Sequence, residues 1–354
     1  MGLPEININF QARAVSAIQR SAMGIVALVL RDETATGTTG VVKIKSVEDV
    51  KTTEWTAQNA DYINQALLGT PSTVTILRVG QDDLIADVLL KLGGLKFNYL
   101  SMPDATPEEE ASIASWIKSK RANDKKTFKA VLGGQDADDM GVINFTTANI
   151  VVGGKTYTPQ QYTPRIAGIL AGLPFTRSAT YYVLPEVESF DEHTDPSMDI
   201  DNGELILVND GENVKIGRAV NSLTTLTASQ KEDYKKIKIV EVMDMITDDI
   251  RDTYNNDYVG KVINIYDNQV LFITAVNAYF KTLMGDQVLD PSYENMSFID
   301  VNAQRLAWEG IGTDTTALDD QQVREMSFGS EVFLAGQVKI TDAMEDLTFN
   351  ILTV

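Results

Sequence analysis

Short apolar runs alternate with helical patterns over the first third of the chain, and this alternation limits the possible folds more than any other feature. The run Ile25–Leu30 is continuously apolar, as in a strand that is buried on both faces. Further strand patterns lie at 41–44, 73–79, 97–101 and 128–132, and helical patterns at 54–68, 82–92 and 106–120. Strands that alternate with helices form sheets covered by helices. This part is therefore predicted to be α/β.

The helix at 106–120 has the clearest start signal in the sequence. Thr106 can cap it, Pro107 suits its first turn, and three glutamates follow at the positive end of the helix dipole. Later patterns are less regular. They predict strands at 144–152, 204–208, 213–220 and 328–340, and helices at 159–171, 230–254, 268–283 and 292–308. The Asn209-Asp210-Gly211 turn indicates a hairpin. The predicted fold class is mixed α/β and α+β.

Both termini carry strand patterns that stand apart from this core. Near the amino terminus, Ile6, Ile8 and Phe10 alternate with Asn7 and Asn9, and at the other end Leu347, Phe349 and Ile351 alternate with Thr348, Asn350 and Leu352. A small or polar stretch separates each pattern from the core. The pattern alone leaves open whether these strands pair within their own chain or with neighbouring copies.

The chain length and the segments that interrupt regular structure predict that the chain has five parts. At 354 residues the chain exceeds the usual size of one domain. An acidic segment without Lys or Arg, between Glu186 and Asn213, suggests a linker or exposed hairpin. The predicted parts are an amino-terminal arm and linker at 1–21, a core at 22–95, a middle α/β domain at 96–200, a second core domain at 201–340 and a carboxy-terminal arm at 341–354.

Composition excludes several classes of function. The 30 basic and 50 acidic residues give a formal net charge of −20, which repels nucleic acid and anionic lipid. No cysteine is present, so thiol chemistry is excluded and synthesis in the cytoplasm is expected. The first residues lack a basic and apolar leader, and no early run is long enough to cross a bilayer. We expect no nucleic-acid partner and no membrane insertion.

The motifs that could carry chemistry are incomplete. The one histidine, His193, lies among carboxylates and could bind a metal, but a solvated loop is the plainer interpretation. Gly153-Gly154-Lys155-Thr156 imitates the end of a phosphate-binding loop, yet Asn149 occupies the position of its first glycine. Asp199, Asp201 and Gly203 resemble the start of a calcium loop without its central glycine. We therefore predict no catalytic residue, no cofactor and no metal.

Charge is placed unfavourably on the helix predicted at 230–254. Three lysines precede four aspartates, which opposes the helix dipole. The lysines are Lys235, Lys236 and Lys238, and the aspartates are Asp244, Asp248, Asp249 and Asp252. Two interpretations remain open: a solvated face, or a charged surface that another subunit neutralises.

The order of motifs in the carboxy-terminal half resembles the contractile tail sheath family. Gly217–Thr225 precedes the apolar pattern Ile237–Ile250, and Tyr258-Val259-Gly260-Lys261 then leads to a helix and late strands. The start, Gly2-Leu3-Pro4 before an Ile-Asn strand, is also similar to sheaths of Gram-positive phages and diffocin-type bacteriocins. The resemblance covers essentially the whole chain.

The resemblance implies a structural protein and not an enzyme. It implies hexameric rings that stack as a helical sleeve around a tail tube, meet baseplate and tail terminator proteins, and contract to drive the tube through an envelope without nucleotide. The subunit would be made in the bacterial cytoplasm and end in a virion tail or a released bacteriocin particle. Arms at Pro4–Phe10 and Leu347–Val354 would join neighbouring subunits' sheets, with hinges at 11–20 and 341–346. The alternatives are another phage tail or tube protein, or a metal-dependent α/β enzyme that uses the loop around His193.

Overall fold

The structure is a computed structural model that describes residue 18 and residues 24–34 and 40–353. The described chain divides into two compact units. The first unit spans 249–340. The second spans 24–248 and includes the tail from residue 341 onward, so the chain leaves the second unit in one helix and returns to it after Ile340.

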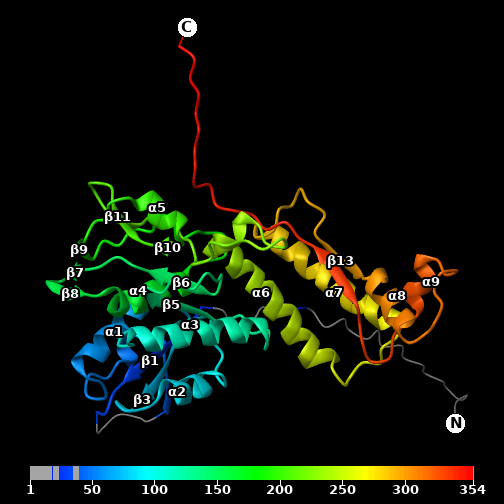
Figure 1. Cartoon of the computed structure of the whole chain (residues 1–354), viewed down its shortest axis with the longest axis horizontal. Helices are drawn as coiled ribbons and strands as arrows, with labels where there is room; N and C mark the ends of the chain where they lie inside the picture. Colours follow the sequence, from blue (N-terminus) through cyan, green and yellow to red (C-terminus); the bar gives the residue numbers. More distant parts are fainter. Residues whose placement is uncertain (1–17, 19–23, 35–39, 354) are drawn as a thin grey trace, which may run out of the picture. The chain divides into compact units, whose positions relative to one another are not determined.

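A seven-stranded sheet forms the centre of the second unit (Figure 1). Its strand order is β10-β6-β5-β4-β1-β3-β2. The bounds are β1 Ile25–Arg31, β2 Gly40–Ile44, β3 Thr73–Val79, β4 Tyr99–Ser101, β5 Lys129–Gly133, β6 Val142–Phe145 and β10 Glu204–Leu205. All neighbours pair in parallel except β2, which runs antiparallel to β3 at the edge. The continuously apolar run at 25–30 is thus an inner strand of the sheet, and it is buried as predicted.

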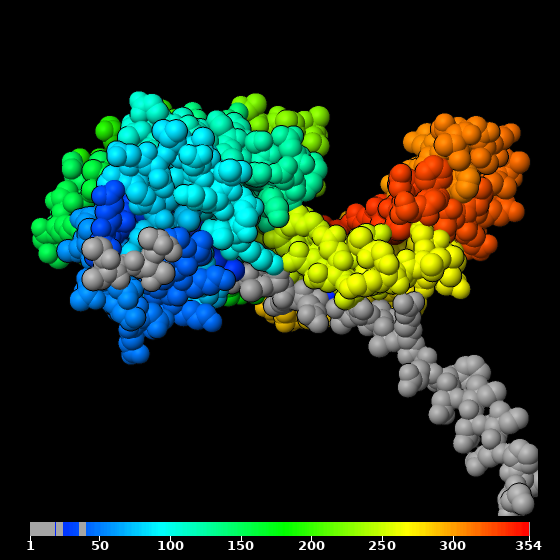
Figure 2. Space-filling view, turned by 90° about the horizontal axis from the view of Figure 1, so that it is seen from below, coloured from blue at the N-terminus to red at the C-terminus, as the bar shows by residue number. Residues whose placement is uncertain are grey.

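Helices cover both faces of this sheet, because alternate residues of β1 enter two separate cores. Val26, Leu28 and Leu30 pack in the core beneath α1 (Ala57–Leu68) and α4 (Pro159–Gly172). Ala27 and Val29 pack in the core beneath α2 (Ile85–Leu92) and α3 (Pro107–Ala122), which form the cyan surface in Figure 2. This is the two-layered burial that a parallel strand requires.

Two local predictions about helices of this sheet are confirmed. Thr106 and Glu109 form a capping box at the start of α3, and Pro107 occupies its first turn.

The contact between α1 and α4 depends on glycine, since a Cβ on Gly168 would lie 2.1 Å from the carbonyl oxygen of Ala66. Any larger residue there would push the two helices apart.

Smaller sheets decorate the second unit. One has the order β8-β7-β9, with β7 Ile150–Val152, β8 Lys155–Tyr157 and β9 Val187–Ser189. The other is the hairpin of β11 (Leu207–Asn209) and β12 (Val214–Ile216), which confirms the predicted turn. The strand predicted at 144–152 is wrong in one respect: Asn149 has a φ of 52°, so the chain turns and β6 and β7 belong to different sheets. Short helices complete this region: η1 Val47–Asp49, α5 Pro196–Asp201 and η2 Glu232–Lys235.

The first unit is mainly helical. It contains α7 (Tyr266–Gly285), α8 (Val301–Gly310), α9 (Asp320–Glu325) and the antiparallel pair β13 (Met296–Ile299) and β14 (Leu334–Gln337). A π-helical turn, η3 (Tyr254–Tyr258), follows α6 (Ile237–Thr253), the helix in which the chain passes from the second unit to the first.

Three predictions for this part of the chain need correction. The helix predicted at 292–308 is a strand followed by a helix, because the Asp300 carboxylate accepts from the amide of Ala303 and starts α8 there. The helix predicted from residue 230 begins at Ile237, after the turn η2. The strand predicted at 328–340 is limited to Leu334–Gln337.

The predicted mixed fold class is confirmed. Segments assigned from sequence to three separate domains all contribute strands to the one large sheet, so the compact units of the described chain follow other boundaries. Among the described residues, no helix combines the length and apolarity needed to cross a membrane.

Candidate inter-subunit arm site

The carboxy-terminal tail has two parts with opposite character. We call 341–346 the tail anchor and 347–353 the arm. Lys238 donates from its ammonium group to the carbonyl oxygen of Thr341, and Lys236 pairs with the carboxylate of Asp342. Burial lowers the pKa of Lys238, whereas the hydrogen bond to Asp342 raises the pKa of Lys236.

Two further residues hold the end of the tail anchor. Ser178 donates to the Glu345 carboxylate at 2.8 Å, and the Arg218 guanidinium lies 2.5 Å from the Asp346 carboxylate and 3.7 Å from that of Glu345. In the described chain the acidic side chains of this segment are thus bound to basic and hydroxyl groups of the second unit, and the hinge at 341–346 stays a prediction.

The arm is exposed along its whole length. Leu347, Phe349 and Ile351 are 89%, 76% and 72% exposed, and they belong to no helix or strand of the described chain. Figure 1 shows this stretch as an extended trace beyond the tail anchor. Ile6, Ile8 and Phe10 lie outside the described residues. Strand pairing by either arm stays a prediction.

The charges on α6 answer the question that the sequence left open. Asp244, Asp248 and Asp249 are 4%, 6% and 0% exposed, so they form no solvated face. Asp244 accepts from both Arg121 and Lys129 at 2.8–2.9 Å. Although burial alone would raise the pKa of Asp244, these two cations hold that pKa below its usual value.

Asp248 and Asp249 also have partners within the chain. Thr127 donates to Asp248 at 2.5 Å, and the Tyr279 hydroxyl donates to Asp249 at 2.6 Å. The charge of Asp244 is thus neutralised by cations of its own chain, and Asp248 and Asp249 accept hydrogen bonds within it. Neither the solvated face nor neutralisation by another subunit holds for these residues.

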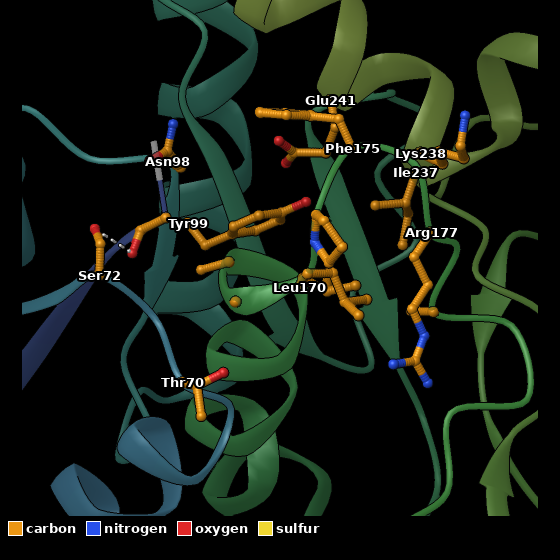
Figure 3. Close-up of a pocket in the computed structure, with 16 residues that line it drawn as sticks. Thr70, Ser72, Asn98, Tyr99, Leu170, Phe175, Arg177, Ile237, Lys238 and Glu241 are labelled. Atoms are coloured by element: carbon orange, nitrogen blue, oxygen red, sulfur yellow. Dashed lines mark hydrogen bonds between the residues drawn. The ribbon is translucent and has the colours of Figure 1, made fainter. Parts of the chain in front are cut away.

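A cavity of about 340 Å³ lies near the start of α6 (Figure 3). Tyr99 and Glu241 face each other on one wall, and Ser72 donates to the Gly24 carbonyl at 3.1 Å on another. Burial, then the charge of Glu241, raises the pKa of Tyr99 well above its usual value. Glu241 pairs with the buried Lys129 at 3.1 Å. The Glu241 carboxylate on the wall of this cavity is therefore already paired with a cation.

The crevice where nucleotide-binding sheets hold their ligand is lined in this structure by residues that include the paired Arg31 and Glu109. In a parallel sheet, ligands bind beyond the carboxyl ends of strands at the point where strand order reverses, which here is between β1 and β4. At that edge both terminal nitrogens of Arg31 donate to the Glu109 carboxylate. The cation that would attract a phosphate is therefore neutralised.

The region around His193 is more ordered than an open loop. The imidazole Nδ1 lies 2.8 Å from Asp199, and Nε2 lies 3.0 Å from the Thr147 hydroxyl. Ligand atoms of His193, Asp199 and Glu204 all lie within 4.8 Å of one another, so these three residues could hold a cation. Asp201 lies in the same short helix, α5, as Asp199, so the residues that resembled the start of a calcium loop in the sequence are helical.

The loop that imitates a phosphate-binding motif is a β-hairpin. Gly153 and Gly154 have φ values of 58° and 73° and connect β7 to β8. The side chain of Lys155, which was predicted to be solvated, is 40% exposed, and its ammonium group also lies 2.7 Å from the carboxylate of Asp61.

Sequence reasoning missed the residues that hold the tail. Arg218, Lys236 and Lys238 each contact a residue more than 100 positions away in the sequence. The only sequence signal was complementary charge: an acidic run at 342–346 and a basic cluster at 235–238. Such a signal is shared by many surface segments and does not identify a pair.

Comparisons with known proteins agree on one family. Residues 55–222 match the phage tail sheath protein central domain, and residues 229–352 match the phage tail sheath C-terminal domain. The tail sheath protein of Clostridium phage phiCD119 is 38% identical over 360 residues, which cover 99% of each chain.

Two solved structures share the fold. The sheath tail protein of Desulfitobacterium hafniense has a TM-score of 0.71 at 17% identity, over 84% of this chain and 94% of that one. The helical sheath of the anti-feeding prophage in its contracted state has a TM-score of 0.73 at 11% identity, over 99% of both chains. Together with the two domain matches and the full-length relative, these likenesses show that the chain belongs to the phage tail sheath family.

Proposed function

We propose that the chain is the structural subunit of a contractile sleeve: hexameric rings stack around a tail tube, and contraction drives that tube through a cell envelope. Membership in the tail sheath family supports this function, and so does the fold shared with a contracted sheath. The observation that carries it is the arm, an exposed apolar strand pattern that starts from a fixed anchor on the second unit.

The energetics of the arm favour pairing with a neighbour. Complete burial of a large apolar side chain contributes about 1.5–3 kcal/mol, and Leu347, Phe349 and Ile351 are almost fully exposed in the described chain. Each backbone hydrogen bond that an added strand forms contributes roughly 0.5–1.5 kcal/mol net. One arm gives a modest contact, and many arms along a sleeve give a connected mesh.

The five-part organisation is part of this proposal. Residues 1–21 and 341–354 act as arms, and the parts at 22–95, 96–200 and 201–340 form the body. The partners are other copies of the chain, the tail tube protein, and baseplate and tail terminator proteins. The particle is a phage tail or a released bacteriocin, assembled from subunits made in the bacterial cytoplasm. No catalytic turnover or cofactor is involved.

A triple substitution of the arm tests the proposal. Leu347→Ser, Phe349→Ser and Ile351→Ser together should leave the thermal unfolding of the subunit unchanged, because these side chains contact little in it. Sleeve formation, followed by sedimentation and negative-stain microscopy, should be lost. The matched control removes three exposed apolar side chains outside the tail: Leu84→Ser, Leu90→Ser and Leu306→Ser, at 70%, 79% and 67% exposure. Normal sleeves from the arm variant, or loss of sleeves from the control as well, would contradict the proposal.

The cluster of His193, Asp199 and Glu204 is the observation that favours the alternative, a metal-dependent enzyme. Under the sheath proposal, His193→Ala keeps sleeve assembly. Under the alternative, wild-type protein binds a stoichiometric divalent metal by elemental analysis and the variant loses it together with a measurable turnover.

A further inference from the structure

Three side chains of metal-binding type meet at one edge of the large sheet in the second unit. They are the imidazole of His193 and the carboxylates of Asp199 and Glu204, and one ligand atom of each lies within 4.8 Å of the others. His193 follows β9, Asp199 belongs to α5, and Glu204 begins β10. α5 contacts β10 at this edge (Figure 1). Three parts of the acidic segment 186–213 therefore converge on one point.

The backbone holds each of these three residues in place by contacts of its own. The amide two residues before His193 donates to the carbonyl of Ala148 at 3.0 Å. The carboxylate of Asp195 caps the helix that carries Asp199. The third residue, Glu204, pairs in parallel with β6. The ligand group is thus preorganised by the fold, as a metal site requires.

The two carboxylates have no basic residue to neutralise them. No Lys or Arg of the described chain forms an ion pair with Asp199 or Glu204, and none occurs in the sequence between 186 and 213. Glu204 accepts from the Thr146 hydroxyl at 2.7 Å, and Asp199 lies 2.8 Å from Nδ1 of His193. With a neutral imidazole, the group carries two negative charges that repel each other at short range. One divalent cation cancels that charge.

A buried hydroxyl supports the imidazole in the orientation that metal binding needs. Nε2 of His193 lies 3.0 Å from the hydroxyl of Thr147, which is 0% exposed and also accepts from the amide of Leu207. When Nδ1 binds a cation, Nε2 carries the proton and donates a hydrogen bond to this hydroxyl. Histidines that bind metals use their second ring nitrogen in this way. Nδ1, which faces Asp199, is therefore the ligand atom.

The types of ligand select the class of cation. One imidazole nitrogen and two carboxylate oxygens, without a thiolate, match Zn²⁺ and Mn²⁺. Ca²⁺ takes roughly six to eight oxygen ligands, and Mg²⁺ keeps several of its waters. Ligands on a tetrahedral Zn²⁺ lie about 3.4 Å apart, so the widest pair here closes by roughly 1.4 Å on binding. The side chains of His193 and Asp199 are 13% and 21% exposed, so a cation reaches them from solvent.

We propose that His193, Asp199 and Glu204 bind one Zn²⁺ or Mn²⁺ per subunit, with water in the remaining positions. The cation fastens the segment after β9 and the short helix α5 to β10, an edge strand of only two residues. This departs from the sequence-based prediction of no metal, because no local pattern brings Glu204 next to His193. The cation holds segments together and supports no turnover, so the inference is independent of the proposed sleeve and of the enzymatic alternative.

Metal binding to the purified full-length chain tests the site. The protein is stripped with a chelator and dialysed against Zn²⁺ or Mn²⁺, and bound metal is measured by elemental analysis. We expect one cation per chain and a higher midpoint of thermal unfolding. Asp199→Asn and Glu204→Gln should each weaken binding at least about tenfold, the loss that removal of even an outer partner causes. Circular dichroism checks that both variants are folded. The matched controls, Glu192→Gln and Asp201→Asn, change exposed carboxylates of the same segment and should bind like wild type.

His193 provides a second readout that needs no variant. It is the one histidine of the chain, so modification of imidazole by diethyl pyrocarbonate reports on this site alone. Bound Zn²⁺ should protect it, as followed by mass spectrometry of the peptide that contains it. No bound cation, equal affinity in the cluster variants and the controls, or modification of His193 at the same rate with and without metal would each overturn the site. Sleeve assembly, scored separately by microscopy, tests the proposed function and not this inference.

Discussion

A cluster of buried and paired charges contributes to the stability of the second unit. Asp244 and Lys129 are both almost fully buried, and each is neutralised by the other together with Arg121 and Glu241. Burial alone would lower the pKa of Lys129, but Asp244 and Glu241 raise it above its usual value. The cluster joins β5, α3 and α6, so it connects the start of α6 to the large sheet.

Removing one member of this cluster should be costly. Asp244→Ala leaves Lys129 and Arg121 buried without their main partner, and loss of one partner from a buried pair typically costs about 3–5 kcal/mol. We expect a fall of that size in the free energy of unfolding measured with urea. The control is Asp257→Ala, an exposed aspartate in η3, with an expected change within about 0.5 kcal/mol. Equal effects of the two substitutions would contradict the account.

Glu110 should make stability depend on pH. Its side chain is 1% exposed, its Oε1 accepts from the Gly133 amide at 2.6 Å, and burial raises its pKa to about 7 from a usual 4.5. Between these two values the unfolded chain has lost the proton and the folded chain has kept it. Stability therefore falls as the pH rises through this window, and the loss is complete above pH 7.

Glu110→Gln removes this titration. The stability of the variant relative to wild type should be higher at pH 8 than at pH 5, by roughly 1–3 kcal/mol from the size of the shift. Urea unfolding at both pH values measures it, with the exposed neighbour Glu108→Gln as control. An identical difference at both pH values would show that the buried carboxyl does not titrate as described.

At the scale of elements, the sequence predicted those whose own residues determine them. β1 is continuously apolar from Ile25 to Leu30, and α3 has its capping box and proline within four residues, so their existence and type followed from local pattern. The segment 292–308 was mistaken for a helix because its apolar spacing fits both structures. What makes 296–299 a strand is pairing with β14, almost 40 residues later in the chain, which no local pattern contains.

The candidate site also combines features that local sequence predicts with features that only long-range contacts determine. The apolar alternation of Leu347, Phe349 and Ile351 was visible in the sequence, and the exposure of these residues was not. The tail anchor could not be predicted, because its ion pairs join segments that only the fold brings together.

The tail anchor should matter for assembly more than for folding. Lys236 and Asp342 are about one-third exposed, and such pairs contribute only about 0–1 kcal/mol to stability. Lys236→Asp places like charges together at the start of the tail, so we expect nearly normal unfolding but fewer sleeves in a sedimentation assay. The exchange Lys236→Asp with Asp342→Lys restores the pair and should restore assembly. Failure of the double variant to exceed the single one would argue against an anchoring role.

At the scale of the whole molecule, the described chain pairs the charges at its possible ligand sites and leaves its carboxy-terminal arm exposed. At two places where the described chain could hold a small molecule, charges are already paired within the chain: Arg31 with Glu109 at the crevice beside β1 and β4, and Glu241 with Lys129 at the wall of the cavity. The apolar arm stays exposed. A body of this kind is suited to join copies of itself.

The amino-terminal arm is expected to act in the same way. Residues 1–10 carry the second alternating pattern, with Ile6, Ile8 and Phe10. Deletion of these ten residues should leave a folded, soluble subunit that forms no sleeves. Normal sleeves from the deleted chain would show that this arm is dispensable.

Negative-stain electron microscopy of the purified full-length chain tests the central claim most directly. The account predicts hollow sleeves built of stacked rings with six subunits in each. Dispersed single subunits at every protein concentration, with no rings or sleeves, would contradict it.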